Sequence, residues 1–321
     1  MLFKKAAEDR AARGFIGYRN PYLKGVAPLG RTPQCEPRVT HMQSLIFGHV
    51  LRADSPILVV TPHSGTQIPD ELSEHPAWKP IEGRLADPAG IALQAEAAKR
   101  NIATIAARYH PCVIDFNVAA DNRPLSLSLN RTGLCRTHTS RGESLYEAGC
   151  QPAEDEVEAR VARYWRPFHA AMTAELQRLR QLHANVLVLV SHASYWLSPY
   201  RNQGNAFDCN VGSDRGRSCD RRLVSALTDV AGANGRSWVV NGKVADVFAA
   251  HHYGAPEDGI HALEIEIAGR WRAELERDGP HANEAGEAFG ALFEALERSL
   301  VQLPDTRRHG RPATESNRFP G

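Results

Sequence analysis

The sequence of residues 57–65 is ILVVTPHSG, a short apolar run that ends in a turn with a histidine. Short runs rich in Val and Ile, with turn residues at their ends, are typical of buried strands. Further runs of this kind are at 112–116, 186–190, 238–240 and 262–267. We predict that all of these segments are strands.

Segments of helical periodicity separate these runs. They are 89–100, 153–183, 220–230 and 284–301. Pro167 predicts a break or kink of the longest helix near Arg166, because proline cannot donate a backbone hydrogen bond. Strands that alternate with helices predict a single α/β domain, with a central, mostly parallel or mixed sheet and helices on both faces.

The two ends of the chain differ from this central part. Residues 1–50 show little periodicity and contain four prolines, so we expect an irregular N-terminal lead-in. Residues 304–321 are polar, with Pro and Gly, and are expected to be a disordered tail. The α/β domain is therefore expected at 51–303.

The composition is that of an ordinary globular protein. Hydrophobic residues make up 42% of the 321, and 38 Lys and Arg balance 37 Asp and Glu, for a net charge of +1. Nucleic-acid and membrane-surface partners need a concentrated basic field, so we expect neither. We find neither a signal peptide nor the roughly 18 apolar residues of a membrane span. The six cysteines form no C-x-x-C pair, so we expect reduced thiols and a cytoplasmic protein, of unknown oligomeric state.

Polar residues with catalytic chemistry lie at the ends of several predicted strands. His63 follows the first run and His192 follows the run 186–190, while Asp115 and Asn117 lie within and after the run 112–116. In open α/β sheets, ligands bind in the crevice beyond the carboxyl ends of the strands. We therefore expect these side chains to share one site.

Glu264 and Glu266 lie in the last predicted strand, two residues apart, and so point to the same face. Two neutral imidazoles and a carboxylate suit a catalytic Zn²⁺ that leaves a fourth position for water. Zinc lowers the pKa of that water and polarises the carbonyl group under attack. A second carboxylate is then needed to take the proton and pass it to the leaving nitrogen. The sequence therefore offers residues of the right types for metal-assisted hydrolysis of an amide.

Each candidate also has a structural interpretation. A histidine after a strand can be a capping or packing residue, and Asp115 can simply bond a neighbouring loop. The two glutamates could lie on an exposed edge strand. His251 and His252 resemble a metal pair, but adjacent side chains diverge, so at most one can face the site. Ser64 lacks the G-x-S-x-G elbow of serine hydrolases.

Five segments, in order, resemble the N-formylglutamate amidohydrolase (N-formylglutamate deformylase) family. They are TPHSGTQIP at 61–69, VIDFN at 113–117 with DNRPL at 121–125, YWRPFH at 164–169, FDCNVGSDRGRSCD at 207–220 and HHYGAPEDGIHALEIEIA at 251–268. They cover most of the chain, and the last of them is the most specific.

The resemblance implies a fold similar to that of zinc-dependent exopeptidases, with one Zn²⁺ per chain at the strand ends of a mixed sheet. It implies hydrolysis of N-formyl-L-glutamate to glutamate and formate, or of a related small-molecule amide. In the matching motifs, His63, His192 and Asp87 correspond to the metal ligands. Glu266 corresponds to the catalytic glutamate of the family's HALQxEx strand. Asp87 is the weakest match, and its alternative role is the N-cap of the helix that begins at Ala89.

Three arginines that the family usually has are replaced. Val118, Tyr195 and His251 stand at their positions. A guanidinium binds a carboxylate bidentately, which Val and Tyr cannot do. N-formylglutamate carries two carboxylates, so we expect instead a less acidic N-formyl or N-acyl compound, or one stacked on Tyr195, Trp196 or Trp271.

We expect the substrate to contact seven residues. They are Asp115, Asn117, Arg123, Tyr195, His252, Tyr253 and Glu264. The basic residues that remain for a carboxylate group, each of which could also be a solvated surface charge, are Arg123, Arg131, Arg136, Arg201, Arg270 and Arg272.

Two further hypotheses stay open. The first is a carboxypeptidase-like metallohydrolase with a larger substrate, which would release amino acids from peptides. The second is a pseudoenzyme that binds a ligand without turnover, motivated by the reduced motif around Asp87 and by the replaced arginines.

Overall fold

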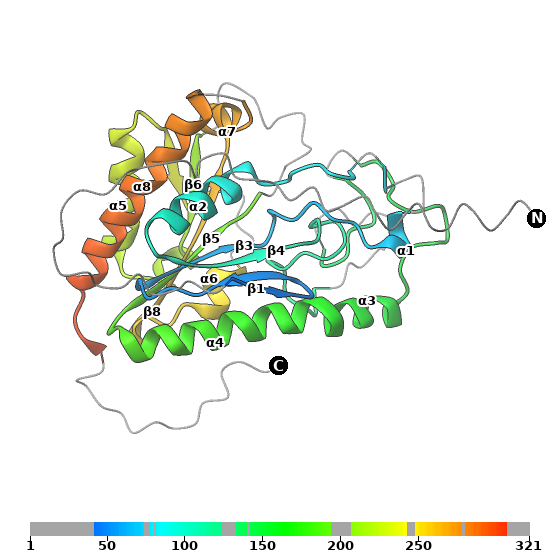
Figure 1. The fold of residues 1–321 in the computed structure, drawn as a ribbon, viewed down its shortest axis with the longest axis horizontal. Helices are drawn as coiled ribbons and strands as arrows, with labels where there is room; N and C mark the ends of the chain where they lie inside the picture. The colour runs from blue at the N-terminus through cyan, green and yellow to red at the C-terminus, as the bar shows by residue number, and fades with distance from the viewer. Residues whose placement is uncertain are drawn as a thin grey trace, which may run out of the picture. The chain divides into compact units, whose positions relative to one another are not determined.

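The computed structural model describes residues 42–73, 78–79, 81–122, 133–139, 142–193, 207–242, 248–277 and 280–306. The chain divides into two units, Met1–Val39 and Thr40–Gly321, and all described residues belong to the second. Within it, eight strands form one mixed sheet in the order β1-β2-β4-β3-β5-β8-β6-β7 (Figure 1).

Four parallel strands form the centre of the sheet. They are β4 (Ala103–Ala107), β3 (Ile57–Thr61), β5 (Val186–Ser191) and β8 (Ile260–Ile267). Antiparallel pairings extend both sides. The outer strands are β1 (Met42–Leu45), β2 (Gly48–Leu51), β6 (Cys209–Gly212) and β7 (Trp238–Val240). The carboxyl ends of the four central strands therefore lie along one edge of the sheet.

Helices cover both faces of the sheet (Figure 1). One face carries a long helix in three parts, α3 (Glu154–Arg160), the π-helical turn η3 (Val161–Trp165) and α4 (Arg166–Leu182), together with α6 (Phe248–Tyr253). The other face carries α2 (Pro88–Lys99), α5 (Arg221–Ala233), α7 (Gly269–Leu275) and α8 (Pro280–Val301). The short helical turns are α1 (Asp70–Ser73), η4 (Asp214–Gly216) and η5 (Pro256–Asp258).

The central strands are apolar on both sides because each face packs against helices. All six residues of β5 are buried. Val186, Val188 and Val190 belong to the core under α4, whereas Leu187 and Leu189 belong to the core under α2, α5 and α8. Side chains alternate along a strand, so a strand buried on both faces is a continuous apolar run. The predicted single α/β domain with a mixed sheet is confirmed.

Two sequence-based predictions of local structure were wrong. Residues 112–116 are not a strand, because 111–113 form turns and the backbone N–H of Val113 bonds to His110. The strand of this region is β4, whose small alanine-rich sequence did not suggest one. Residues 42–50 are not irregular either, since they form β1 and most of β2.

The long helix changes its hydrogen bonding at the place where a break was predicted, because the π-helical turn η3 directly precedes Arg166. The backbone nevertheless stays helical through Arg166 and Pro167, so the helix does not end there. Most of the predicted lead-in and tail lies outside the described residues. None of the described helices is both long enough and apolar enough to cross a membrane.

Candidate active site

His63 lies in the turn after β3, at the carboxyl edge of the parallel strands. The chain then passes close to the end of β4, where a Cβ on Gly65 would lie 2.3 Å from the carbonyl oxygen of Tyr109. Glycine is needed there because no other residue lets the two backbones approach so closely. Ser64 Oγ donates to the carbonyl of Thr61 at 2.9 Å, so Ser64 stabilises the turn.

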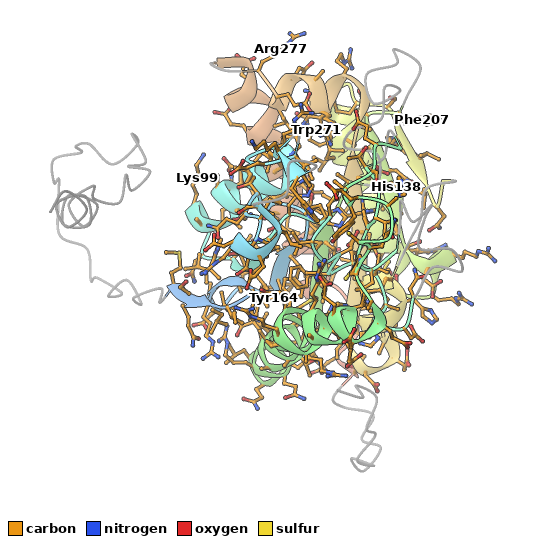
Figure 2. The ribbon with its side chains drawn as sticks, turned by 90° about the vertical axis from the view of Figure 1, so that its right-hand side faces the viewer. Lys99, His138, Tyr164, Phe207, Trp271 and Arg277 are labelled. Atoms are coloured by element: carbon orange, nitrogen blue, oxygen red, sulfur yellow. The ribbon has the colours of Figure 1, made fainter. Side chains whose placement is uncertain are left out.

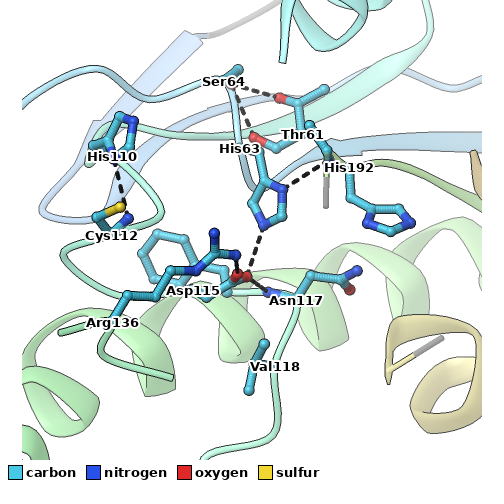
Figure 3. Close-up of polar contacts among 12 residues, drawn as sticks. Thr61, His63, Ser64, His110, Cys112, Asp115, Asn117, Val118, Arg136 and His192 are labelled. Atoms are coloured by element: carbon cyan, nitrogen blue, oxygen red, sulfur yellow. Dashed lines mark hydrogen bonds and ion pairs between the residues drawn. The ribbon is translucent and has the colours of Figure 1, made fainter. Parts of the chain in front are cut away.

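The His63 ring is held on both sides (Figure 3). Its Nε2 lies 2.8 Å from Asp115 Oδ1, and its Nδ1 accepts the backbone N–H of Ala193 at 3.0 Å. An ionised carboxylate can only accept, so His63 donates from Nε2 and keeps its lone pair on Nδ1. The rings of His63 and His192 lie next to each other, with centroids 6.1 Å apart.

Asp115 is the acceptor for several donors in this cluster (Figure 3). Its carboxylate accepts from His63, from the guanidinium of Arg136 and from the backbone N–H of Asn117. Asp115 and Arg136 are only 2% and 4% exposed. Burial opposes ionisation of Asp115, but the interactions with His63 and Arg136 and the hydrogen bonds lower its pKa below the ordinary value. Asp115 is therefore ionised at neutral pH and orients His63.

His192 follows β5 and has Glu264 of β8 beside it. His192 Nε2 lies 3.6 Å from Glu264 Oε2. The Glu264 carboxylate also accepts from Asn117 Nδ2 at 2.8 Å and from the backbone N–H of Ala250 at 2.9 Å. Burial is the main reason that the pKa of His192 falls to about 3, so this ring is neutral near pH 7. Like His63, it has a carboxylate next to its Nε2.

Glu266 lies on the same face of β8 as Glu264, two residues nearer to the carboxyl end. Both are buried, with exposed fractions of 9% and 1%. Glu266 pairs in the sheet with Asn210, and the backbone N–H of His192 donates to Ile265. The backbone of Glu266 thus lies next to that of His192 at the end of the sheet, and its part in a reaction stays a prediction.

Comparison with known proteins gives a family for this chain. Residues 55–271 match the family described as N-formylglutamate amidohydrolase. The chain belongs to that family. The N-formylglutamate deformylase of Pseudomonas aeruginosa is 29% identical over 260 residues, which cover 78% of this chain and 94% of the relative. That of Pseudomonas putida is 31% identical over 214 residues, which cover 66% of this chain and 80% of the relative.

A solved structure of the same family has a similar fold. The N-formylglutamate amidohydrolase of Ralstonia eutropha superposes with a TM-score of 0.61 at 22% sequence identity, covering 80% of this chain and 96% of the other. The resemblance stated from the sequence motifs is confirmed.

The donor set of this member of the N-formylglutamate amidohydrolase family can be compared with the needs of a zinc ion. Two imidazoles on one zinc, with Zn–N bonds of about 2.1 Å at a tetrahedral angle, have centroids about 5 Å apart. The centroids of His63 and His192 are 6.1 Å apart, which is longer than this, and Nδ1 of His63 accepts the backbone N–H of Ala193. The described part of the chain holds no group of three or more His, Cys, Asp or Glu side chains suited to a metal. His63 and His192 are therefore two neighbouring imidazoles without a third candidate ligand among the described residues, and their role as zinc ligands stays a prediction.

Asp87, the expected acidic ligand, is the N-cap of α2. Its Oδ1 accepts the backbone N–H of Ala89 at 3.1 Å, and its Oδ2 accepts from Ser191 Oγ at 2.6 Å. Side chains alternate along β5, so Ser191 faces α2 while His192 turns to the other face. Both carboxylate oxygens thus bind protein donors on the far side of the sheet from Glu264. Asp87 therefore has the capping role that was its alternative, and neither of its oxygens is directed at His63 or His192 by a contact of the described residues.

The two α6 residues that were expected to contact substrate differ in exposure. Tyr253 is 1% exposed, and its hydroxyl lies 2.5 Å from His169 Nδ1. It is a residue of the core and presents almost no surface to a substrate. His252 is half-buried, with its ring stacked on Phe248 at a centroid distance of 5.1 Å.

Of the three aromatic residues expected in the pocket, only Trp271 is among the described residues, and it lies elsewhere. Trp271 lies in the core under α8, stacked on Phe289 at 5.0 Å, so its placement in the pocket was wrong (Figure 2). Tyr195, Trp196 and Arg123 lie outside the described residues.

Three of the six basic candidates are described, and one of them is at the site. Arg136 binds Asp115. Arg270 is exposed on the surface, and Arg272 is buried with its guanidinium bonded to Glu276. Arg131 and Arg201 lie outside the described residues, like Arg123.

Two contacts of the site were not anticipated from the sequence. The backbone N–H of Ala250 binds Glu264, and no sequence signal marks such a donor because every residue except proline carries one. The pairing of Arg136 with Asp115 follows from the backbone bond between Asp115 and Leu134, which brings two separate segments together.

Proposed function

We propose that this protein hydrolyses the amide bond of a small N-formyl or N-acyl compound at the site formed by His63, His192 and Glu266. The observation that carries the proposal is the pair of neighbouring buried imidazoles, each with a carboxylate beside its Nε2, at the carboxyl ends of β3 and β5. Membership of the N-formylglutamate amidohydrolase family supports it, as do relatives that are named N-formylglutamate deformylases.

We infer that a zinc ion is the electrophile and that His63 and His192 hold it. Zinc supplies an acidic water and polarises the amide carbonyl when it is bound. The chain's own part is to hold both imidazoles in one orientation. Asp115 accepts from Nε2 of His63, which leaves the lone pair on Nδ1; that lone pair accepts the backbone N–H of Ala193, so a zinc ion would have to take the place of this N–H at Nδ1.

We assign the proton transfer to Glu266 rather than Glu264. The two oxygens of Glu264 accept from Asn117 and Ala250, so this carboxylate is committed to holding the site together. Glu266 lies on the same face at the end of the strand and is the more exposed of the two. It takes a proton from the attacking water and returns it to the leaving nitrogen.

The charges of the described residues favour a substrate less acidic than N-formylglutamate. Arg136 is engaged by Asp115, Arg270 is on the surface and Arg272 bonds to Glu276. A buried substrate carboxylate without a cationic partner costs several kcal/mol, on the order of 3–5. We therefore propose a substrate with at most one carboxylate.

The test is a hydrolysis screen over N-formyl and N-acyl amino acids with acidic, neutral and aromatic side chains. We expect release of the free amine from neutral or aromatic members, and loss of turnover in Glu266→Gln. The matched control is Glu274→Gln, a Glu-to-Gln change on α7 at a residue that pairs with Arg236. No hydrolysis of any amide in the screen, by protein supplied with zinc, would sink the proposal.

A further inference from the structure

The long helix donates three side-chain hydrogen bonds to the backbone of one loop, residues 113–118. The donors and acceptors are Arg160 Nη1 to Val113 O at 3.0 Å, Trp165 Nε1 to Val118 O at 2.9 Å and His169 Nε2 to Phe116 O at 3.0 Å. All three donor side chains are buried, with exposed fractions below 9%. The loop is therefore fixed to the helix at three of its carbonyl groups.

The π-turn η3 makes this possible. Arg160 and Trp165 are five residues apart, whereas residues on one face of an α-helix are three or four apart. In η3 the backbone N–H of Arg166 bonds to the carbonyl of Val161, five residues earlier. The additional residue in that turn brings Trp165 to the face that carries Arg160. Single π-turns within α-helices are frequent at functional sites.

This loop contacts the candidate site next to both of its histidines. It carries Asp115, which orients His63, and Asn117, which donates to Glu264. The three bonded carbonyls lie on either side of these residues and between them. A shift of the loop would therefore move the carboxylate of Asp115 and the amide of Asn117 together, and with them the contacts to His63 and Glu264.

His169 ties the loop to a second support. Its Nε2 must donate to the Phe116 carbonyl, so its Nδ1 accepts from the hydroxyl of Tyr253 in α6. The same helix contributes the backbone N–H of Ala250 that binds Glu264. The loop binds Glu264 through Asn117, and α6 binds Glu264 through Ala250. The buried imidazole of His169 is hydrogen-bonded to both the loop and α6.

We propose that Trp165 and His169 are positioning residues of the active site. They act through the 113–118 loop: they hold Asp115 against His63 and Asn117 against Glu264, so that both histidines keep one orientation. The effect on hydrolysis rests on the proposed function of the site, whereas the effect on the geometry of His63 does not.

A simple packing role is the competing explanation. The Phe116 and Phe168 rings stack at 4.4 Å, and the Trp165 and His169 rings lie 3.9 Å apart. Any substitution in this aromatic cluster costs stability wherever the site is. The experiment therefore needs a control that loses the same kind of bond elsewhere.

Trp271 provides that control. Its Nε1 donates to the carbonyl of Ala285 at 2.9 Å in the core on the other face of the sheet. Trp165→Phe and Trp271→Phe are the same chemical change, and each removes one indole-to-carbonyl hydrogen bond. We expect similar losses in the denaturant midpoint for both. Only Trp165→Phe is expected to lower kcat, by about 10- to 100-fold with KM little changed, as for other residues that orient a ligand.

The orientation of the His63 ring can also be measured in the absence of any hydrolysis reaction. In isotope-labelled full-length protein, the Nε2 proton that His63 shares with Asp115 gives a downfield NMR signal, which His63→Gln identifies by removing it. We expect Trp165→Phe, and His169→Gln, to shift this signal and speed its exchange with solvent. Trp271→Phe is expected to leave it unchanged.

Equal behaviour of the two tryptophan variants, in kcat and in the His63 proton, would overturn the proposal and leave Trp165 as a packing residue. A selective change in Trp165→Phe supports it. If the wild-type protein hydrolyses nothing, the proposed function fails, while the His63 proton still decides whether Trp165 and His169 position that ring.

Discussion

Replacing Asp115 by asparagine tests the buried charge cluster most sharply. The carboxylate is 2% exposed and accepts from His63, Arg136 and the backbone of Asn117. Asparagine has nearly the same shape but no charge. Asp115→Asn therefore leaves the 4% exposed guanidinium of Arg136 without its counter-charge and weakens the bond that orients His63.

The expected cost follows from this arrangement. Removing one partner of a buried ion pair costs about 3–5 kcal/mol, since the other charge stays in a poorly solvated place. That is a large part of the roughly 5–15 kcal/mol by which domains of this kind are stable. Removing both charges together, in Asp115→Asn with Arg136→Met, is expected to restore most of the stability, because a buried pair often contributes little net free energy.

The single and the double variant together separate the effect on protein stability from the effect on the orientation of His63. Urea unfolding measures the stability, and the hydrolysis rate of the best substrate reports on the orientation. The double variant should unfold close to the wild type yet stay about 10- to 100-fold slower, because His63 still lacks its carboxylate. Full activity in the stable double variant would refute the orienting role and leave Asp115 as a partner for Arg136 only.

Two further results are expected. Asp87→Asn keeps an N-cap side chain and should retain both stability and zinc content, whereas Asp87→Ala should cost about 1–2 kcal/mol in urea unfolding; loss of zinc in Asp87→Asn alone would restore Asp87 as a ligand. Burial is the main cause that lowers the pKa of His110 and of His169 from 6.5 to about 3. As the pH falls below 6.5, these two histidines take up protons in the unfolded chain but not in the folded one. The free energy of unfolding therefore decreases as the pH falls. Each imidazole should cost about 2 kcal/mol between pH 7 and pH 5, and unfolding curves that coincide at the two pH values would contradict this.

Much of the fold could be predicted because its central strands are apolar on both faces. ILVVT at 57–61 and VLVLV at 186–190 are distinctive for that reason, and both are strands. The sequence ATIAA of β4 is just as buried, but its small side chains do not stand out from helical segments. CVIDF at 112–116 looks like a strand, yet its apolar residues pack in turns against the long helix.

The site could be predicted as a set of residues but not as a set of contacts. Position after a strand marked His63 and His192, which the structure places side by side. Whether a carboxylate caps a helix or faces a histidine depends on which face of the sheet it reaches. For Asp87 the bond with Ser191 decides this, and no local pattern shows it. The same holds for Trp165, whose contact with Val118 depends on a single π-turn.

We propose that His63 and His192 form a zinc-dependent centre for amide hydrolysis. The hydrolysis rate of chelator-treated protein, followed as zinc is added back, tests this most directly. We expect the rate to start near zero, rise in proportion to zinc and level off at about one equivalent per chain, as for a single catalytic site. A rate that is already maximal in stripped protein, or that never responds to zinc, would contradict the claim.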